Sequence, residues 1–209
     1  ILRVGDKVFL SVDEDFRFDI AKNHSATHLL NESLRRVVGS HIFQQGSYVA
    51  NNFLRFDFNN FSPLTNEEIL KVEDEVNKEI LAGHKVNIKK MNIDEAKKLG
   101  AQAVFGEKYG DTVRVVDMEY SKEFCGGTHV HNTKDIKRFA IIGIETKGSG
   151  IYRIEAATDT HIEEELATAL ENIEKEIKFN IDKIVELKKI AKEYHITIDN
   201  VSEEISPIV

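Results

Sequence analysis

Two pairs of potential metal ligands lie about 100 residues apart in this chain. His24 and His28 are four positions apart, so both imidazoles share one face if this stretch is helical. Cys125 and His129 are separated by two glycines and a threonine, and glycines allow a tight loop that places a thiolate beside an imidazole. Three nitrogens and one sulfur suit tetrahedral zinc, whereas calcium and magnesium favour oxygen ligands. If both pairs bind one ion, the fold must bring a helix and a distant loop together across a groove.

Other zinc signatures fit this chain less well. The metalloprotease pattern H-E-x-x-H needs a glutamate between its histidines, but Ser25, Ala26 and Thr27 stand there. The H-x-E and P-C-x-x-C patterns of zinc nucleobase deaminases are absent. A structural zinc site usually takes ligands from short C-x-x-C knuckles, for which one cysteine is too few. We therefore predict an accessible zinc site.

The prediction depends on the joint pattern, because each half alone has an ordinary explanation. A lone cysteine is most often a small buried apolar residue, and a single histidine pair at helical spacing is a weak signal. The other histidines have no partner at ligand spacing and are predicted to be surface or packing residues: His41, His84, His131, His161 and His195.

The charge is unevenly distributed. The 209 residues include 28 Lys and Arg and 36 Asp and Glu, a formal charge of −8. Residues 161–209 hold 12 acidic and 6 basic residues, which leaves 24 acidic and 22 basic ones in the first 160. No broad basic face for sequence-independent nucleic-acid binding is apparent, so a nucleic-acid partner must be argued from chemistry. Three short basic pairs are interpreted as solvated surface: Arg35-Arg36, Lys89-Lys90 and Lys137-Arg138.

Length and composition exclude several classes of protein. Hydrophobic residues make up 41% of the chain, which is typical of a folded domain. No run of about 18 apolar residues occurs, so no membrane-spanning helix is predicted. A single cysteine excludes an internal disulfide, and we predict a cytoplasmic location. The chain begins at Ile1 without a signal peptide, and we expect it to be a piece of a longer protein.

Alternating apolar residues predict a β-hairpin near the N-terminus. Its two arms centre on Leu10 and Phe18, and Asp13-Glu14-Asp15 lies between them. A helix is predicted over residues 24–38, with Asn23 as its N-cap and Gly39 at its end. Residues 54–58 alternate apolar and polar side chains and predict a strand with one polar face.

The later elements follow no regular strand–helix–strand order. Thr65 and Glu68 form a capping box, which predicts a helix that ends near Ala82 before Gly83. Further strands are predicted over residues 86–91, 112–118, 139–144 and 151–157, and a short helix over 94–99. This mixture favours an α+β fold over a doubly wound sheet.

We predict three parts along the chain. Residues 1–22 form a small β-hairpin or barrel-like part, and residues 23–160 form a two-layer α+β domain that binds zinc. Residues 161–209 form a long C-terminal amphipathic helix or linker, because apolar residues recur three or four apart from Leu166 to Tyr194. Whether this helix packs on the body or begins a coiled coil with a second copy stays open.

Six short motifs follow one another along the chain: NHSATHLL (23–30), QQGS (44–47), LRFDF (54–58), FGEKYG (105–110), CGGTHV (125–130) and RIEA (153–156). In this order they resemble the motifs of the editing domain of alanyl-tRNA synthetase. The resemblance covers about residues 5–158, and the tail is similar to the helix that follows this domain. Free-standing AlaX-type editing proteins share much of the pattern. Threonyl-tRNA synthetase has a related domain, but the Cys-Gly-Gly-Thr-His form resembles the alanyl type.

The resemblance implies hydrolysis of mischarged tRNA, namely Ser-tRNA(Ala) and Gly-tRNA(Ala). A pocket built for alanine cannot exclude glycine and excludes serine poorly, because such binding differences give only about 10–200-fold selectivity. The implied partners are the acceptor end of tRNA(Ala) carrying Ser or Gly and the rest of a synthetase chain that binds ATP. No membrane partner is expected, and a homo-oligomer through the C-terminal helix is possible. This piece lacks the synthetase core and is not expected to charge tRNA.

Matching of positions then assigns roles to residues. The Zn²⁺ ligands are His24, His28, Cys125 and His129. The catalytic positions are Thr27, which we assign to selection of the substrate side chain, and Gln44, which we assign to a hydrogen bond with the substrate or the attacking water. The substrate-binding positions are Arg55, Asp57, Gly126 and Gly127. For the first two, a cross-strand ion pair is an equal alternative, and the two glycines are assigned as oxyanion donors.

Two other functions stay open at this point. The first is threonyl-type editing of Ser-tRNA(Thr). The second is a non-catalytic module for tRNA binding or dimerisation that holds a structural zinc, which the long acidic helix motivates. How zinc acts is also open, because four protein ligands fill a tetrahedral shell and the sequence does not distinguish water activation from substrate positioning.

Overall fold

The computed structural model describes residues 3–103 and 109–197. The chain divides into two compact units, Ile1–Glu165 and Leu166–Val209, and each is described by itself. The first unit contains helices and two antiparallel sheets, and the described part of the second is helical up to Glu193. The predicted α+β class is therefore confirmed.

The prediction of an N-terminal β-hairpin is wrong. Helix α1 spans Glu14–Val37, and no strand lies among residues 3–13. Asp13 is its N-cap and accepts a hydrogen bond from the Phe16 amide, while Glu14 and Asp15 lie at the positive end of the helix dipole. The acidic triplet that was interpreted as a turn thus starts a helix, and three alternating apolar residues are too short a pattern to outweigh this capping signal. Helix α1 therefore begins ten residues before the predicted start at residue 24, and it continues through position 23 without a break.

A four-stranded antiparallel sheet carries most of the core of the first unit. Its order is β1 (Gln44–Val49), β2 (Leu54–Asn59), β7 (Ile151–Thr158) and β6 (Phe139–Gly148). The predicted alternation in β2 is confirmed, because Leu54, Phe56 and Phe58 are fully buried and the residues between them are not. Strand β1 was not predicted, because its sequence lacks an apolar face and its pairing with β2 holds it in place.

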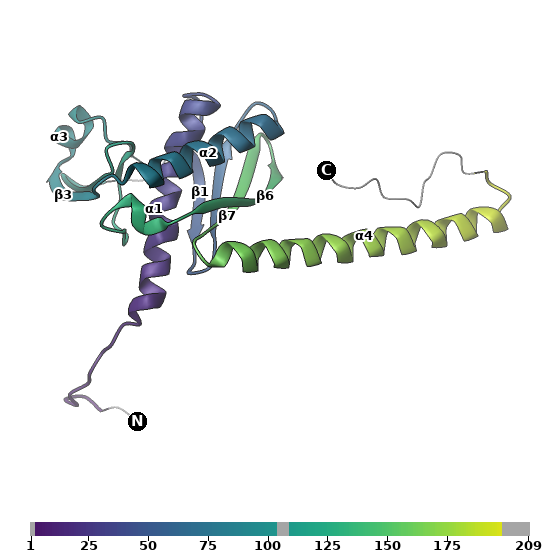
Figure 1. Ribbon diagram of the computed structural model, residues 1–209, viewed down its shortest axis with the longest axis horizontal. Helices are drawn as coiled ribbons and strands as arrows, with labels where there is room; N and C mark the ends of the chain where they lie inside the picture. The colour runs from purple at the N-terminus through teal and green to yellow at the C-terminus, as the bar shows by residue number, and fades with distance from the viewer. Residues whose placement is uncertain (1–2, 104–108, 198–209) are drawn as a thin grey trace. The chain divides into compact units, whose positions relative to one another are not determined.

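Helices α1 and α2 (Asn66–Ala82) pack against each other and against this sheet (Figure 1). The capping box of α2 is confirmed in both directions between Thr65 and Glu68, and Gly83 ends the helix with a φ of 74°. Asn23, predicted as an N-cap, is instead buried within α1. Its Nδ2 donates to the carbonyls of residues 50 and 51, and its Oδ1 accepts from Thr158 Oγ1, so it ties α1 to the end of the β2–β7 pair where β2 begins and β7 ends.

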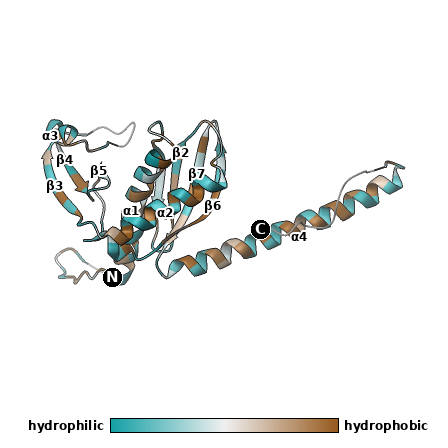
Figure 2. Ribbon diagram, turned by 45° about the horizontal axis from the view of Figure 1, so that its top comes forward, coloured by the Kyte–Doolittle hydropathy of each residue, from teal (hydrophilic) through white to brown (hydrophobic). Residues whose placement is uncertain are grey.

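A second, three-stranded sheet of β3 (Asn87–Asn92), β4 (Thr112–Asp117) and β5 (Lys122–Phe124) has a small core of its own with α3 (Ile93–Lys98). The two sheets lie on opposite sides of α1 (Figures 1 and 2). Cys125 follows β5 directly, so the position of the small sheet places the Cys125–His129 loop beside α1. The short strand β5 was not predicted, and residues 105–108 of the FGEKYG motif lie outside the described residues.

The described part of the second unit continues α4 (His161–Glu193), so the predicted long helix is confirmed over these residues. Apolar and polar residues alternate along α4 at helical spacing (Figure 2). Among its exposed large apolar side chains are Leu170, Phe179 and Leu187. No helix in the described part of the chain is long and apolar enough to cross a membrane.

Candidate metal centre

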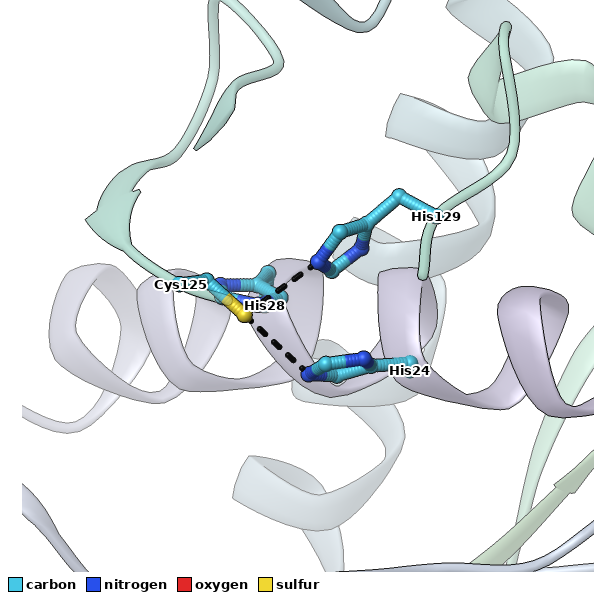
Figure 3. Close-up of side chains that lie close together, drawn as sticks. All are labelled: His24, His28, Cys125 and His129. Atoms are coloured by element: carbon cyan, nitrogen blue, oxygen red, sulfur yellow. Dashed lines mark hydrogen bonds between the residues drawn. The ribbon is translucent and has the colours of Figure 1, made fainter. Parts of the chain in front are cut away.

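The four predicted ligand residues converge on one point (Figure 3). Helix α1 presents His24 and His28 one turn apart, and the loop after β5 presents Cys125 and His129. One ligand atom from each residue lies within 4.8 Å of all the others. Residues that are about 100 positions apart in sequence therefore form one cluster, as the spacing predicted.

Two distances within the cluster match those between the ligand atoms of a zinc ion. Bonds of about 2.0–2.1 Å to nitrogen and 2.3 Å to sulfur place tetrahedral ligand atoms roughly 3.3–3.6 Å apart. Cys125 Sγ lies 3.4 Å from His24 Nε2 and 3.3 Å from His129 Nε2. The donor set contains no carboxylate oxygen, so it suits zinc better than calcium or magnesium.

Outer partners orient all three imidazoles through the same ring nitrogen. The Nδ1 atom of His24 lies 3.1 Å from the Thr128 carbonyl oxygen, and that of His129 lies 3.1 Å from Ser25 Oγ. The Nδ1 atom of His28 lies 2.6 Å from a carboxylate oxygen of Glu123. Nδ1 is thereby engaged in each ring and Nε2 is left as the ligand atom, which is how histidine ligands of metals are usually fixed.

Glu123 is the main residue of this site that the sequence did not predict. It is 5% exposed, and it accepts hydrogen bonds from Asn31 Nδ2 at 2.9 Å and Ser121 Oγ at 3.1 Å besides its contact with His28. Burial raises its pKa, but the charge and hydrogen bonds of these neighbours bring it below the usual value, so the carboxylate is ionised. One signal was available: positions 123 and 125 are two apart along extended chain, and such residues share a face.

The cluster favours the thiolate form of its cysteine. Burial raises the pKa of Cys125, but hydrogen bonds with His129, His24 and His28 lower it to about 3. The thiolate is the form of cysteine that binds metals. Burial also lowers the pKa of His129 to about 4, which keeps its imidazole neutral. The chemistry of the donor set thus fits a zinc ion.

The two glycines of the loop serve different purposes. A Cβ atom added to Gly127 would lie 2.1 Å from His24 Cε1, so only glycine lets the loop pack against that imidazole. The Gly127 amide donates toward Cys125 Sγ at 3.5 Å and is engaged there. A Cβ on Gly126 meets no atom within 4 Å, so packing does not explain why that residue is glycine.

A cavity of about 190 Å³, here called the metal cavity, opens beside the cluster. It is lined by three of the four ligands and by both predicted catalytic residues, Thr27 and Gln44. Thr27 is buried, and its Oγ1 donates to the Asn23 carbonyl at 2.9 Å, which leaves its lone pairs as acceptors. Gln44 Nε2 donates to Ser47 Oγ at 3.2 Å, and Ser47 lines the same cavity.

Arg55 and Asp57 line neither the metal cavity nor its larger neighbour described below. Asp57 accepts two hydrogen bonds from Arg153 at 2.7 and 2.8 Å, and Arg55 lies 3.3 Å from Glu155. Both pairs join β2 to β7, which matches the cross-strand alternative. A substrate-binding role for these two residues stays a prediction.

The remaining described histidines form no second metal group with the residues that the structure describes. His84 contacts the carboxylates of Glu79 and Glu119, and His41 contacts Asn60. His161 contacts Asp19. These contacts agree with surface and packing roles.

Comparison with known proteins gives the chain its class. Residues 113–155 match the family described as "Threonyl and Alanyl tRNA synthetase second additional domain". The chain is 53% identical over 161 residues to alanine–tRNA ligase 1 of Lachnoclostridium phytofermentans and 52% identical over 158 residues to alanine–tRNA ligase of Staphylococcus aureus. These alignments cover 77% and 75% of this chain but only 18% of each relative.

The fold, the cluster and the family match define a domain of the kind that threonyl- and alanyl-tRNA synthetases share. Within that class, the chain is 52–53% identical to alanine–tRNA ligases over about three quarters of its own length. This identity assigns it to the alanyl-tRNA synthetase family, where it corresponds to an editing-domain segment. The resemblance found in the sequence motifs is thereby confirmed.

Proposed function

We propose that this domain hydrolyses the ester bond of Ser-tRNA(Ala) and Gly-tRNA(Ala). The observation that carries the proposal is the metal cavity, in which three of the proposed zinc ligands, a buried hydroxyl acceptor and an amide side chain surround a space of about 190 Å³. That volume is below the 300–1,000 Å³ of typical ligand pockets, so it suits a small aminoacyl group rather than a whole nucleotide.

Thr27 is proposed to recognise the substrate side chain. Its hydroxyl hydrogen is engaged with the Asn23 carbonyl, so Oγ1 can only accept toward the cavity. A seryl hydroxyl can donate to this oxygen. A glycyl group is smaller and fits the same space without that hydrogen bond.

Gln44 is proposed to hold the substrate amino group or the attacking water. Its Nε2 is engaged with Ser47, so Oε1 is the atom left to accept a hydrogen bond in the cavity. Because the Gly127 amide already faces Cys125 Sγ, Gly126 is the glycine we retain as an oxyanion donor.

The proposed zinc ligands are His24, His28, Cys125 and His129. When bound, zinc supplies Lewis acidity beside the ester. The chain's own contribution is to hold three Nε2 atoms and one thiolate close together through outer partners beside a small cavity.

The proposal is tested by deacylation of Ser-tRNA(Ala), Gly-tRNA(Ala) and Ser-tRNA(Thr) by this chain, before and after chelation and zinc return. We expect hydrolysis of both tRNA(Ala) esters, loss on chelation and recovery with zinc. Faster hydrolysis of Ser-tRNA(Thr) would instead indicate threonyl-type editing. Melting is followed in parallel: in a non-catalytic module with a purely structural zinc, chelation would lower the melting temperature and no deacylation would occur at any zinc level. In Cys125→Ala, deacylation that persists after loss of zinc would show that the metal is dispensable.

A further inference from the structure

A second cavity, here called the outer cavity, borders the Cys125–His129 loop. Its volume is about 520 Å³, within the range of sites that bind whole small ligands. It is lined by the first turns of α1, by Ile88 and Arg114 of the small sheet, and by the loop itself. Among the residues that the structure describes, only Gly126 lines both the outer cavity and the metal cavity.

The outer cavity offers the chemistry that a nucleotide needs. Arg17 and Arg114 provide two guanidinium groups, and Phe18 and His131 provide two aromatic rings. Unpaired RNA bases are usually bound by stacking on aromatic or guanidinium planes, with cations on the phosphates. Glu14 contributes one carboxylate, which can accept from an amino group of a base but leaves a net positive lining.

The two arginines are not equivalent. Arg114 Nη1 donates to the Cys125 carbonyl at 2.6 Å, so it also supports the metal-binding loop. Arg17 is exposed, and the salt bridges among the described residues do not include it. Arg17 is therefore the cation that is available to a ligand, and it can be replaced without disturbing the loop.

Gly126 connects the two spaces. Neither a positive φ nor a crowded Cβ requires glycine at this position. A side chain there would extend into the junction of the cavities. The absence of a side chain is explained if one ligand passes over Gly126 with a large end in the outer cavity and a small end in the metal cavity.

We propose that the outer cavity binds a nucleoside 5′-phosphate, the 3′-terminal nucleotide of the substrate, and that the aminoacyl ester reaches over Gly126 into the metal cavity. This inference rests on the proposed function and adds the subsite that holds the leaving ribose. It assigns Arg17 to the phosphate and Phe18 to the base.

The binding test uses adenosine 5′-monophosphate as the probe, titrated into the zinc-loaded chain by calorimetry. We expect Arg17→Ala and Phe18→Ala each to weaken binding about tenfold, the scale of one charged hydrogen bond or one stacked base. Lys71→Ala removes an equal charge from the exposed face of α2, outside both cavities, and should leave binding unchanged. Affinities in Arg17→Ala and Phe18→Ala that equal the affinity in Lys71→Ala would overturn the inference.

The junction is tested with Gly126→Val. We expect deacylation to fall about 100-fold or more, as for other misplaced substrates, while zinc content and melting temperature stay unchanged and monophosphate binding stays within about twofold. Gly143→Val is the matched control, because its added Cβ also meets no atom and it lines neither cavity. If Gly126→Val does not fold, Gly126→Ala replaces it. Deacylation equal to that of Gly143→Val would refute the junction.

Failure of this inference is distinguishable from failure of the proposed function. Monophosphate binding that depends on Arg17, in a chain without deacylase activity, would support the nucleotide site and refute the proposed function. Deacylation with an unchanged KM in Arg17→Ala, and no binding that depends on Arg17, would refute the nucleotide site alone.

Discussion

The Nδ1 atom of His28 lies 2.6 Å from the Oε2 atom of Glu123, and the side chains of both residues are 7% exposed. Burial lowers the pKa of His28, but the charge of Glu123 and the contact with Cys125 raise it to about 10. The pair is buried, and removing one member of such a pair leaves the other uncompensated. Glu123 therefore fixes the orientation of the imidazole of a proposed zinc ligand, and that imidazole in turn compensates the buried charge of Glu123.

Replacement of Glu123 should weaken zinc binding. We expect Glu123→Gln, which keeps an oxygen acceptor but not the charge, to lower zinc affinity about tenfold, and Glu123→Ala up to 100-fold. Because Glu123→Ala also leaves Asn31 and Ser121 without their acceptor, it should destabilise the metal-free fold by about 3–5 kcal/mol. Zinc affinity is measured by competition with a chromophoric chelator, and stability by denaturant unfolding with chelator present.

The control for this prediction is Glu119→Gln. Glu119 also contacts a histidine, His84, but its side chain is 64% exposed and His84 is not one of the proposed zinc ligands. We expect no change in zinc affinity. Equal affinities in Glu123→Gln and Glu119→Gln would show that Glu123 does not orient a ligand.

Alanine at the two loop glycines should have opposite outcomes. In Gly127→Ala the new Cβ would lie 2.1 Å from His24 Cε1, so either the loop or the imidazole must move. We expect a loss of about 1–3 kcal/mol in stability and substoichiometric zinc. In Gly126→Ala the Cβ meets no atom within 4 Å, and stability and zinc content should match the unsubstituted chain. Metal analysis after dialysis, with thermal melting, checks both; retention of full zinc by Gly127→Ala would contradict the geometry.

The cluster could be predicted from sequence because its ligand types and spacing are local signals. Two histidines four apart need only a helix, and the pair Cys125–His129 needs only a tight loop. The outer partners could not be predicted this way. Glu123, Ser25 and the Thr128 carbonyl acquire their roles only when the small sheet docks against α1, which is a tertiary event.

The fold shows the same limit. The end of helix α2 was predicted near Ala82, where it lies, because the capping box and the terminal glycine of this helix can both be recognised in the sequence. The start of α1 was missed because its capping residue, Asp13, lay within a stretch whose short alternation imitated a strand. Strand β1 was missed because its conformation depends on pairing with β2 rather than on its own residues.

Replacement of Thr27 by valine tests the selection of the substrate side chain. Valine has nearly the same shape but no acceptor, so the seryl hydroxyl would lose its proposed partner. We expect deacylation of Ser-tRNA(Ala) to fall about 10–100-fold, with a smaller change for Gly-tRNA(Ala). The ratio of the two rates is the informative quantity, because any loss of folding lowers both together. An unchanged ratio would remove Thr27 from side-chain selection.

The last prediction concerns the acid stability of the start of α1. Asp19 lies 3.0 Å from Lys22 Nζ and 3.2 Å from His161 Nε2. Burial raises the pKa of Asp19, but hydrogen bonds from Lys22 and His161 lower it below its usual 3.8. A carboxyl with a lowered pKa stabilises the fold above its unfolded pKa, and this contribution is lost as the pH falls through the folded pKa.

Asp19→Asn should therefore lower the melting temperature at pH 7 by about 2–4 °C, the equivalent of roughly 1 kcal/mol in a chain of this size. The difference from the unsubstituted chain should shrink below about pH 4, because Asp19 is then protonated first in the unfolded chain and, at lower pH, in the folded chain as well. Melting is followed from pH 7 to pH 3 with chelator present, so that zinc release does not contribute. Glu67→Gln, which breaks an exposed pair with Lys71, is the control and should change the melting temperature little. A difference between Asp19→Asn and the unsubstituted chain that is constant across this range would show that the charge of Asp19 contributes nothing.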